Sequence, residues 1–260
     1  MMKIINFNNE NLVKCKCGAV FEYEKSDLVF AKTELSNPFY DLSVRCPKCF
    51  NFISVHDNRD VFPISEFDEI INKNFKYKRI MLKDGSVVTL DIIGKNHDVD
   101  ENGHKTNLTL CFHEIYTRKE INYTYTNYGG WTCSKLRKWL NEEFFNLLPD
   151  RLQKKIVPVV KKTYEDGEIV ETVDKIFIPS EIEVFGKTKY SEKGEGKQYE
   201  FFKDWHNRIK GLEEDKCSTF YWLRSPYSGN SDRFCVVASF GGYISSIAYG
   251  TGGVVPCFAI

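Results

Sequence analysis

The sequence predicts an α+β protein in which a small N-terminal β module precedes a larger mixed domain. Two cysteine pairs lie in the first fifth of the chain, two Asp-Gly turns separate runs of strand-forming residues, and one region has strong helical periodicity. The chain has 260 residues, of which 42% are hydrophobic and 15% aromatic, so it is long enough and apolar enough to bury a sizeable core.

The cysteine pairs define the N-terminal module. Their pattern is C-x-C…C-x-x-C, and the four residues are Cys15, Cys17, Cys46 and Cys49. Thiolates this close together on tight turns can bind one tetrahedral Zn²⁺ at about 2.3 Å. We therefore predict a zinc ribbon over residues 13–57 that holds one Zn²⁺ per chain. Four cysteine ligands leave no open coordination position, so this zinc is expected to be structural.

The residues around these cysteines favour a metal ion. Four cations lie beside the thiolates and would offset their negative charge: Lys14, Lys16, Arg45 and Lys48. A module of about 45 residues has too little core to fold alone, and metal binding would supply the missing free energy. The alternatives are four reduced thiols without a metal, or a redox role for the second pair. His56 is an alternative ligand, although a histidine at the end of a strand is the simpler interpretation.

Residues 58–77 are expected to form a linker with a short helix. Ser65-Glu66-Phe67-Asp68 has the form of a capping box, and apolar residues follow it at helical spacing up to Phe75. This helix either connects the two modules or is the first element of the second domain.

The second domain is predicted to span residues 78–260. Asp84-Gly85 and Asp166-Gly167 each separate two strand-like runs and indicate β-hairpins, and residues 107–116 predict a further strand. The best helix begins after an N-cap at Thr132 or Ser134, and Pro149 ends it.

Two further segments of the second domain differ in character. A shorter helix is expected over residues 151–156. Residues 186–216 are charged and contain several glycines, and we interpret them as an exposed insertion.

The last 44 residues, 217–260, are almost uncharged. Their only charged side chains are Arg224, Asp232 and Arg233. Two runs joined by Gly241-Gly242 predict a β-hairpin near the C-terminus. In this neutral context, Arg224 is expected to make an internal structural contact in preference to a ligand contact.

Residues 225–253 are rich in Ser, Gly and Tyr, a composition similar to that of antibody binding loops. We predict a binding surface there, with candidate ligand-binding residues Tyr227, Asn230, Asp232, Tyr243 and Tyr249. The alternative is a glycine-rich hairpin that only closes the fold.

Composition excludes several classes of protein. The 36 Lys and Arg residues balance 36 Asp and Glu residues, which argues against a dedicated nucleic-acid binder. No segment has the length and composition of a membrane span, and polar residues stand near the N-terminus where a signal peptide has an apolar core. We therefore expect a soluble, cytoplasmic protein. No motif of a common enzyme class occurs, so no catalytic residues and no enzymatic activity are predicted.

Four motifs carry a resemblance to a known family. They begin at Trp131 (W-x-x-S-x-L-R-x-W-L-N-x-x-F), Asp174 (D-K-I-F-I-P-S-x-x-E), Tyr221 (Y-W-L-R-S-P) and Gly253 (G-V-V-P-C-F-A-I). Their order and spacing resemble an uncharacterised domain family of Gram-positive bacteria, their phages and mobile elements, over residues 78–260. The resemblance implies a C-type-lectin-like fold related to the formylglycine-generating enzymes. It also implies a location in the cytoplasm of a host cell, or association with a virion as the alternative. The family's last motif usually reads G-V-R-P-A-F, so Val255 and Cys257 depart from it.

These observations lead to three functional hypotheses. The first is a non-enzymatic, phage-type binding protein whose C-terminal domain binds an unknown protein or other macromolecule. The second is nucleic-acid-associated regulation through the zinc ribbon, which the charge balance disfavours. The third is a cysteine-dependent enzyme using Cys235 and Cys257, which are expected instead to be buried structural thiols.

Overall fold

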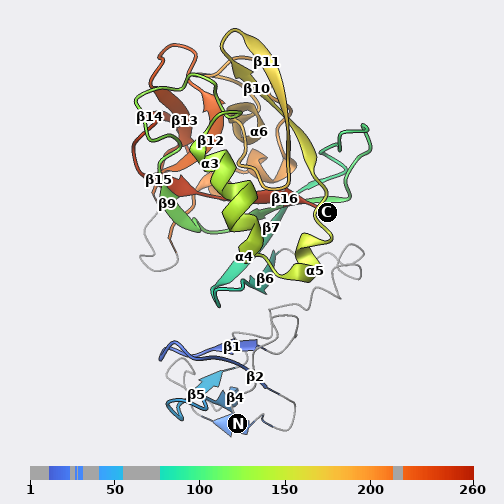
Figure 1. Cartoon of the computed structure of the whole chain (residues 1–260), viewed down its shortest axis with the longest axis vertical. Coiled ribbons are helices and arrows are strands. Elements are labelled where there is room, and N and C mark those ends of the chain that lie inside the picture. Colours follow the sequence, from blue (N-terminus) through green and yellow to red (C-terminus); the bar gives the residue numbers. More distant parts are fainter. Residues whose placement is uncertain (1–11, 24–26, 28, 32–40, 55–76, 213–218) are drawn as a thin grey trace. The chain divides into compact units, whose positions relative to one another are not determined.

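The computed structural model of the 260-residue chain describes residues 12–23, 27, 29–31, 41–54, 77–212 and 219–260. The chain divides into two compact units (Figure 1). Unit 1 comprises residues 1–89 and 147–154, and unit 2 comprises residues 90–146 and 155–260. The predicted boundaries at 13–57, 58–77 and 78–260 stay predictions, and the expected linker helix lies outside the described residues.

Two small antiparallel sheets form the described N-terminal part of unit 1. They consist of β1 (Leu12–Lys14) with β2 (Val20–Glu22), and of β3 (Val29–Ala31), β4 (Asp41–Arg45) and β5 (Phe52–Ser54). β2 follows the first cysteine pair, and β5 follows the second. Among the described residues of these two sheets, Val13 and Val44 form a small buried cluster, with Phe21, Tyr23 and Ile53 packed against it. A core this small gives the module little stability of its own.

Unit 1 also contains the hairpin formed by β6 (Tyr77–Met81) and the start of β7 (Val87–Lys95). The predicted Asp-Gly turn is confirmed: Gly85 has a positive φ, and the Asp84 carboxylate accepts hydrogen bonds from the Ser86 backbone N–H and hydroxyl at 2.8 and 2.6 Å. The short helix α5 (Asp150–Gln153) belongs to the same unit, and Lys83 forms an ion pair with Asp150.

A five-stranded sheet in the order β14-β13-β12-β15-β9 is the largest element of unit 2. Its strands are β9 (Thr117–Lys119), β12 (Tyr221–Pro226), β13 (Arg233–Val237), β14 (Tyr243–Ile247) and β15 (Gly252–Val254). The predicted C-terminal hairpin is confirmed as the antiparallel pair of β13 and β14. Only β12 and β15 pair in parallel.

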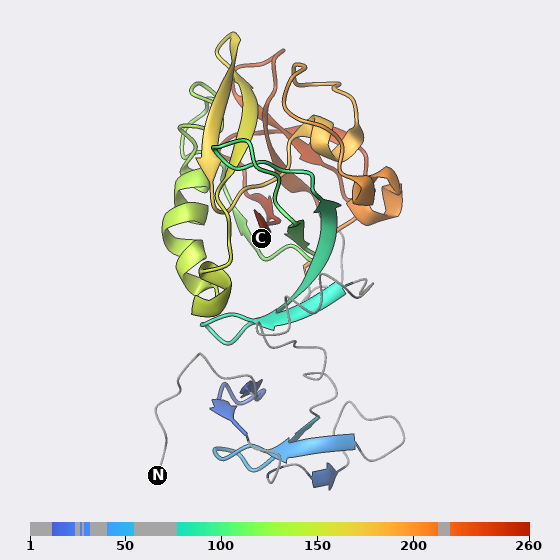
Figure 2. The ribbon, with the colours of Figure 1, turned by 90° about the vertical axis from the view of Figure 1, so that its right-hand side faces the viewer.

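The C-terminal strand returns to the beginning of unit 2. β16 (Cys257–Ala259) pairs with β8 (Leu108–Phe112), and β8 pairs with the curved strand β7 (Figure 2). Every residue of β8 and β16 is buried, so these two strands lie in the core. A separate hairpin joins β10 (Val159–Glu165) to β11 (Glu168–Asp174). Asp166 and Gly167 both have positive φ, as the predicted Asp-Gly turn requires.

The predicted long helix is present but irregular. It consists of α3 (Lys135–Trp139), a π-helical turn η3 (Leu140–Phe144) and α4 (Phe145–Leu147). Ser134 is the N-cap, because its hydroxyl accepts the backbone N–H of Arg137 at 3.1 Å. The remaining helices are α6 (Glu181–Phe185), η4 (Glu200–Lys203) and η5 (Trp205–Arg208). The described residues are thus mostly β, with few and short helices.

The prediction of an exposed insertion over residues 186–216 holds only in part: many residues of its described part are exposed, but some are buried. Five of its residues are buried: Ser191, Glu195, Tyr199, Phe202 and Lys210. The charged ones are buried because other buried groups bind them; Lys210, for example, donates hydrogen bonds to the carbonyls of Phe112 and His113 at 2.7 and 2.9 Å. Among the described helices, none has the length and apolar composition needed to cross a membrane.

Candidate metal centre and binding surface

Each cysteine pair of unit 1 lies on a tight turn. The backbone N–H of Gly18 donates to the carbonyl of Cys15 at 2.8 Å, and the N–H of Phe50 donates to the carbonyl of Cys46 at 2.9 Å. Gly18 and Phe50 both have positive φ, which is unusual for phenylalanine. Phe50 therefore holds a strained backbone conformation directly after the second pair. Each of the two turns keeps the cysteines of its own pair close together.

The four sulfur atoms form one cluster. All of them lie within 4.8 Å of one another, with Sγ–Sγ distances of 3.4 Å between Cys15 and Cys49 and 3.6 Å between Cys17 and Cys46. Four thiolates bound to one tetrahedral Zn²⁺ at about 2.3 Å would be about 3.8 Å apart. The predicted ligands are therefore brought together, and the cluster could hold one metal ion.

The environment of the cluster favours at least one thiolate. Burial raises the pKa of the Cys15 thiol to about 12. Burial acts in the same direction on Cys46, but the backbone N–H groups of Cys49 and Lys48 outweigh it and lower the pKa of Cys46 to about 7. The remaining protons are those that a bound metal ion would displace.

The four motifs of unit 2 meet at the segment 174–183. Asp174 is fully buried, and its carboxylate accepts hydrogen bonds from the indole of Trp131 at 2.9 Å and from the guanidinium of Arg137 at 2.6 Å. The side chain of Asn141 accepts the backbone N–H groups of residues 175 and 176, and donates to the carbonyl of residue 176. The first motif is thus hydrogen-bonded to the second along its length.

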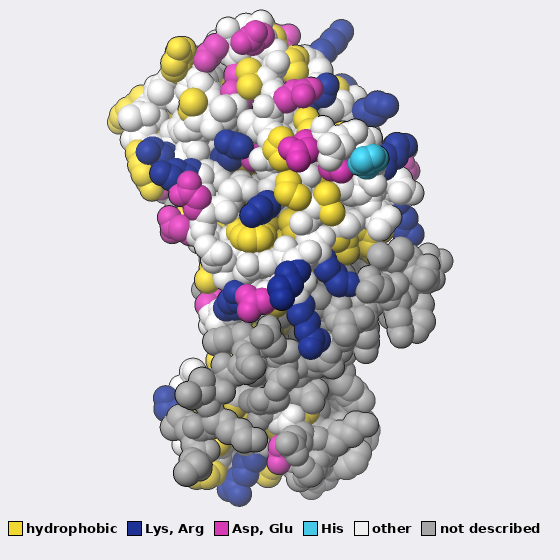
Figure 3. Space-filling view, turned by 45° about the vertical axis from the view of Figure 1, so that its right-hand side comes forward, with side chains coloured by type: hydrophobic (Ala, Val, Ile, Leu, Met, Phe, Trp, Pro, Cys, Tyr) yellow, Lys and Arg dark blue, Asp and Glu magenta, His cyan; other side chains and the backbone are white. Residues whose placement is uncertain are grey.

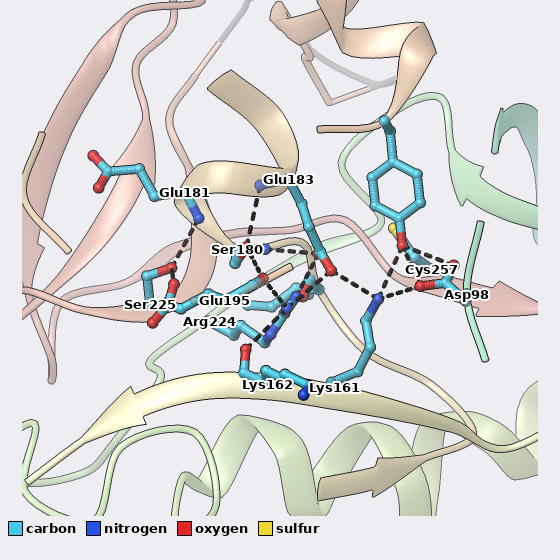
Figure 4. Close-up of polar contacts among 12 residues, drawn as sticks. Asp98, Lys161, Lys162, Ser180, Glu181, Glu183, Glu195, Arg224, Ser225 and Cys257 are labelled. Atoms are coloured by element: carbon cyan, nitrogen blue, oxygen red, sulfur yellow. Dashed lines mark hydrogen bonds and ion pairs between the residues drawn. The ribbon is translucent and has the colours of Figure 1, made fainter. Parts of the chain in front are cut away.

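Arg224, from the third motif, forms a buried ion pair with Glu183, from the second (Figure 4). Two guanidinium nitrogens contact the two carboxylate oxygens at 2.5 and 2.9 Å. Glu183 also completes the capping box of α6, since it accepts the backbone N–H of Ser180 at 3.0 Å. Arg224 therefore makes an internal structural contact, as predicted, and its exposed fraction is 0%.

A second buried cation extends this ion pair into a network. The ammonium group of Lys161, on β10, donates to Asp98 at 2.6 Å and to Glu183 at 2.9 Å. It also donates to the hydroxyl of Tyr199, which itself hydrogen-bonds to Asp98 at 2.9 Å. Because two cations face two carboxylates, the buried charges compensate one another.

Glu195 is a further carboxyl group at the edge of this network. It is fully buried, contacts the hydroxyl of Ser225, and accepts the backbone N–H of Tyr164 at 2.9 Å. Burial raises its pKa to about 7 despite these hydrogen bonds. Burial also acts to raise the pKa of Glu183, but Arg224 and Lys161 reverse the effect and hold it at about 2.

The fourth motif joins the second through the backbone. Phe177 and Cys257 exchange two hydrogen bonds of 2.8 and 2.9 Å between their main chains. All four motifs are therefore joined inside the domain. Cys235 and Cys257 are buried as predicted, and burial raises the pKa of both thiols well above the ordinary value.

The candidate ligand-binding residues are divided between the two ends of β14. Tyr227, Asn230 and Asp232 lie in the turn between β12 and β13, and Tyr249 follows β14 near the same end. Tyr243 begins β14 at the other end, where it faces Val237. Its ring stacks on Phe185 with the centroids 3.7 Å apart, so it contributes to packing.

Three tyrosines outside the predicted segment are more exposed than the three tyrosines among these five. Tyr123, Tyr125 and Tyr128 have exposed fractions of 73%, 69% and 75%. They belong to the loop N-Y-T-Y-T-N-Y-G-G of residues 122–130. The alternation of tyrosine with small polar residues in this loop indicates a binding surface, but the predicted binding surface covers only residues 225–253.

This loop is fixed against the C-terminal segment by Asn127. The Asn127 side-chain amide lies 2.8–3.1 Å from the carbonyls of Tyr227, Asn230 and Arg233. The ring of Tyr125 lies 3.8 Å from that of Tyr249. We call the resulting surface the tyrosine surface, and its residues are Tyr123, Tyr125, Tyr128, Tyr227, Asn230, Asp232 and Tyr249.

A hollow of about 690 Å³ lies at the beginning of α3. Its lining includes Cys133, Lys135, Arg137, Lys138, Glu142 and Lys175. Lys135 connects this hollow to the tyrosine surface, since its ammonium group lies 5.9 Å from the ring centroid of Tyr123. The tyrosine surface therefore continues into a concave, mainly basic region.

These features define a β-rich domain whose buried polar framework is formed by four sequence motifs. A family described as a domain of unknown function (DUF6273) matches residues 105–260, more than half of the chain and all four motifs. The chain belongs to this family. No curated protein and no solved structure matches the chain.

The metal centre gives a first prediction. The purified chain is expected to contain about one zinc ion, and the double variant Cys15→Ser/Cys46→Ser to contain none, because two of four ligands are lost. Unit 1 should then become sensitive to limited proteolysis within residues 12–54, since its core is so small. Elemental analysis by mass spectrometry measures the zinc.

The matched control for this experiment is Cys133→Ser, which removes an exposed thiol outside the cluster. It should keep its zinc. Equal zinc contents in the wild type and the double variant would show that the cluster holds no metal.

The raised pKa of Glu195 gives a second prediction, on stability. Because the folded protein keeps a proton on Glu195 that the unfolded chain releases above pH ~4.3, the free energy of unfolding should fall as pH rises from about 5 to 7. The contribution is on the order of 3 kcal/mol. Glu195→Gln cannot ionise and should remove most of this decline, as measured by urea unfolding at several pH values.

The control for the second prediction is Glu200→Gln, because Glu200 is exposed on η4. It should leave the pH profile unchanged. An identical decline in the wild type and in Glu195→Gln would mean that another group causes it.

Proposed function

We propose that the protein is a non-enzymatic binding protein whose unit 2 binds a protein partner through the tyrosine surface. The observation that carries this proposal is the group of three exposed tyrosines at 123, 125 and 128 on a loop that Asn127 holds in place. Tyrosine rings offer large contact areas and lose little side-chain entropy on binding, which is why they are common in protein-binding loops.

The surroundings of the tyrosine surface support a protein partner. Threonines alternate with the tyrosines at 124 and 126, and the side chains of Asn230 and Asp232 lie in the neighbouring turn. Apolar rings with small hydrogen-bonding neighbours are typical of adaptable protein interfaces. The adjoining hollow could receive a side chain of the partner, and its lysines favour an acidic one.

The buried framework argues for binding and against catalysis. Several motif residues are used inside the domain, where Asp174 accepts hydrogen bonds from the first motif and Glu183 pairs with Arg224. The thiols of Cys235 and Cys257 are buried, and their raised pKa disfavours the nucleophilic thiolate. We therefore place function on the loops around this framework.

We further propose that the four-cysteine cluster holds a structural zinc ion. Four thiolates at tetrahedral spacing are typical of zinc sites. We also propose that unit 2 has a C-type-lectin-like fold, and that the protein is of a phage or mobile-element type. The return of β16 to β8 supports this fold, because it brings the end of the domain back to its beginning.

A second candidate function is nucleic-acid binding by unit 1. Phe50 and Phe52 have exposed fractions of 61% and 41%, and the guanidinium of Arg45 lies 5.3 and 5.8 Å from their ring centroids. Exposed aromatic rings beside cations are typical of surfaces that stack single-stranded bases. However, charges of both signs are interspersed on the face of unit 2 seen in Figure 3, and the net charge of the chain is +0.

Binding through the tyrosine surface can be tested without knowing the natural partner. Displayed random 12-residue peptides are selected against the full chain, and their affinities are measured again for the triple variant Tyr123→Ser/Tyr125→Ser/Tyr128→Ser. We expect at least a tenfold loss, because exposed tyrosines supply most of the contact area.

The control variant Trp205→Ser/Phe240→Ser removes two other exposed aromatic side chains and should keep the wild-type affinity. Peptides that bind the triple variant as well as the wild type would contradict the proposal. Tight binding of a 20-nucleotide DNA strand that is lost in Phe50→Ser/Phe52→Ser would instead favour the second function.

A further inference from the structure

Two of the free cysteines face each other across a pair of buried strands. In the register of β8 and β16, Cys111 is the direct partner of Cys257. Both side chains have an exposed fraction of 0%. They are separated by more than half of the chain, so their meeting is a result of the fold and not of local sequence.

The hydrogen-bond pattern shows which kind of strand pair this is. Leu108 and Ile260 exchange two hydrogen bonds, of 2.9 and 3.1 Å, and hydrogen-bonded and non-hydrogen-bonded pairs alternate along antiparallel strands. The pair of Cys111 and Cys257, three positions away, is therefore non-hydrogen-bonded. The backbone of Cys257 agrees with this, since both of its polar groups bond to Phe177 instead.

This geometry suits a disulfide bond. In non-hydrogen-bonded pairs the Cα atoms are about 4.5 Å apart, and disulfides require Cα–Cα distances of roughly 4.4–6.8 Å. Cys111 is also close enough to Cys257 to contribute to the raised pKa of the Cys257 thiol, after burial as the larger cause. A covalent bond would therefore need little movement of either strand.

Cys235 shows by contrast what is special about this pair. It is equally buried and also lies in a strand, but its direct partner across β13 and β14 is Ser245. Among the described cysteines outside the metal cluster, only Cys111 and Cys257 are direct partners in a strand register.

We infer that Cys111 and Cys257 form a cross-strand disulfide when the chain folds in the presence of a small-molecule disulfide such as oxidised glutathione. The thiolate of one cysteine attacks the glutathione disulfide, which releases one glutathione thiolate and leaves a mixed disulfide. The second cysteine loses its proton, attacks the protein sulfur of that bond and releases the second glutathione. Two protein thiols are oxidised, and one glutathione disulfide is reduced to two thiols.

The timing of this reaction follows from burial. Because both thiols are enclosed and burial raises the pKa of Cys257 well above its ordinary value, the folded, reduced protein should react slowly. Oxidation should be efficient during folding, before β16 is enclosed. The bond would then tie the C-terminal strand covalently to β8 and close a long loop of the chain, which stabilises the folded state.

The test folds the full chain, with zinc present, in either oxidised glutathione or a phosphine reductant. Free thiols are then alkylated in denaturant, and the products are mapped by mass spectrometry. We expect a peptide linking Cys111 to Cys257 only after oxidative folding, together with a rise in melting temperature of roughly 5–15 °C.

Three variants keep the result interpretable. Cys111→Ala and Cys257→Ala should each lose the linked peptide and the difference in melting temperature between oxidised and reduced samples. Cys235→Ala should keep both. If Cys111 and Cys257 are both alkylated as free thiols after oxidative folding, or if the linked peptides join other cysteines, the inference is wrong; the wild-type map decides this even if a variant fails to fold.

Discussion

The ion pair between Arg224 and Glu183 is the constraint on which unit 2 depends. Removing a guanidinium and a carboxylate from water is costly, so a fully buried pair persists only when its geometry is good and its remaining hydrogen bonds are satisfied. Here the pair is bidentate, the carboxylate also caps α6, and the two terminal guanidinium nitrogens of Arg224 also donate to backbone carbonyls, among them that of Ile178. The Nε–H of Arg224 is the one buried donor of the pair without a partner in the described structure. The need to compensate these charges explains why Lys161 and Asp98 are buried beside them.

This framework separates stability from binding. The motif side chains Asp174, Glu183 and Arg224 are buried inside the domain, so they fix the positions of the strands and of α6 but are not available to a partner. Figure 4 shows Glu183 and Arg224 in this buried network. The exposed tyrosines lie on a loop that Asn127 attaches to the turn between β12 and β13. Such an arrangement allows loop residues to change without loss of the core, which is expected of a scaffold that presents a binding surface.

Local features of the fold could be predicted from the sequence, and non-local ones could not. The cysteine pairs and Asp-Gly turns act over a few residues, so their spacing alone indicated the metal cluster and the hairpins. In contrast, Arg224 lies 41 positions from Glu183, and no periodicity marks two residues as partners over that distance. Buried Glu195 and Lys210 were misinterpreted for the same reason, because a charge pattern does not reveal which charges find partners. The contact between Asn127 and the turn after β12 spans about 100 residues. The sequence alone therefore does not show that the loop of residues 122–130 lies beside the predicted binding segment.

The central claim, that the Arg224–Glu183 pair holds the domain together, is tested most directly by a double-mutant cycle. Arg224→Met, Glu183→Gln and the double variant are unfolded with urea, and their free energies of unfolding are compared with the wild type. Each single substitution removes one half of the pair, so that Arg224 keeps only backbone carbonyls as partners, or Glu183 keeps only Lys161 as a charged partner. Each should therefore cost about 3–5 kcal/mol, whereas the double variant should cost clearly less than the sum of the two. Additive losses of below ~1 kcal/mol each would show that the pair contributes little to the fold.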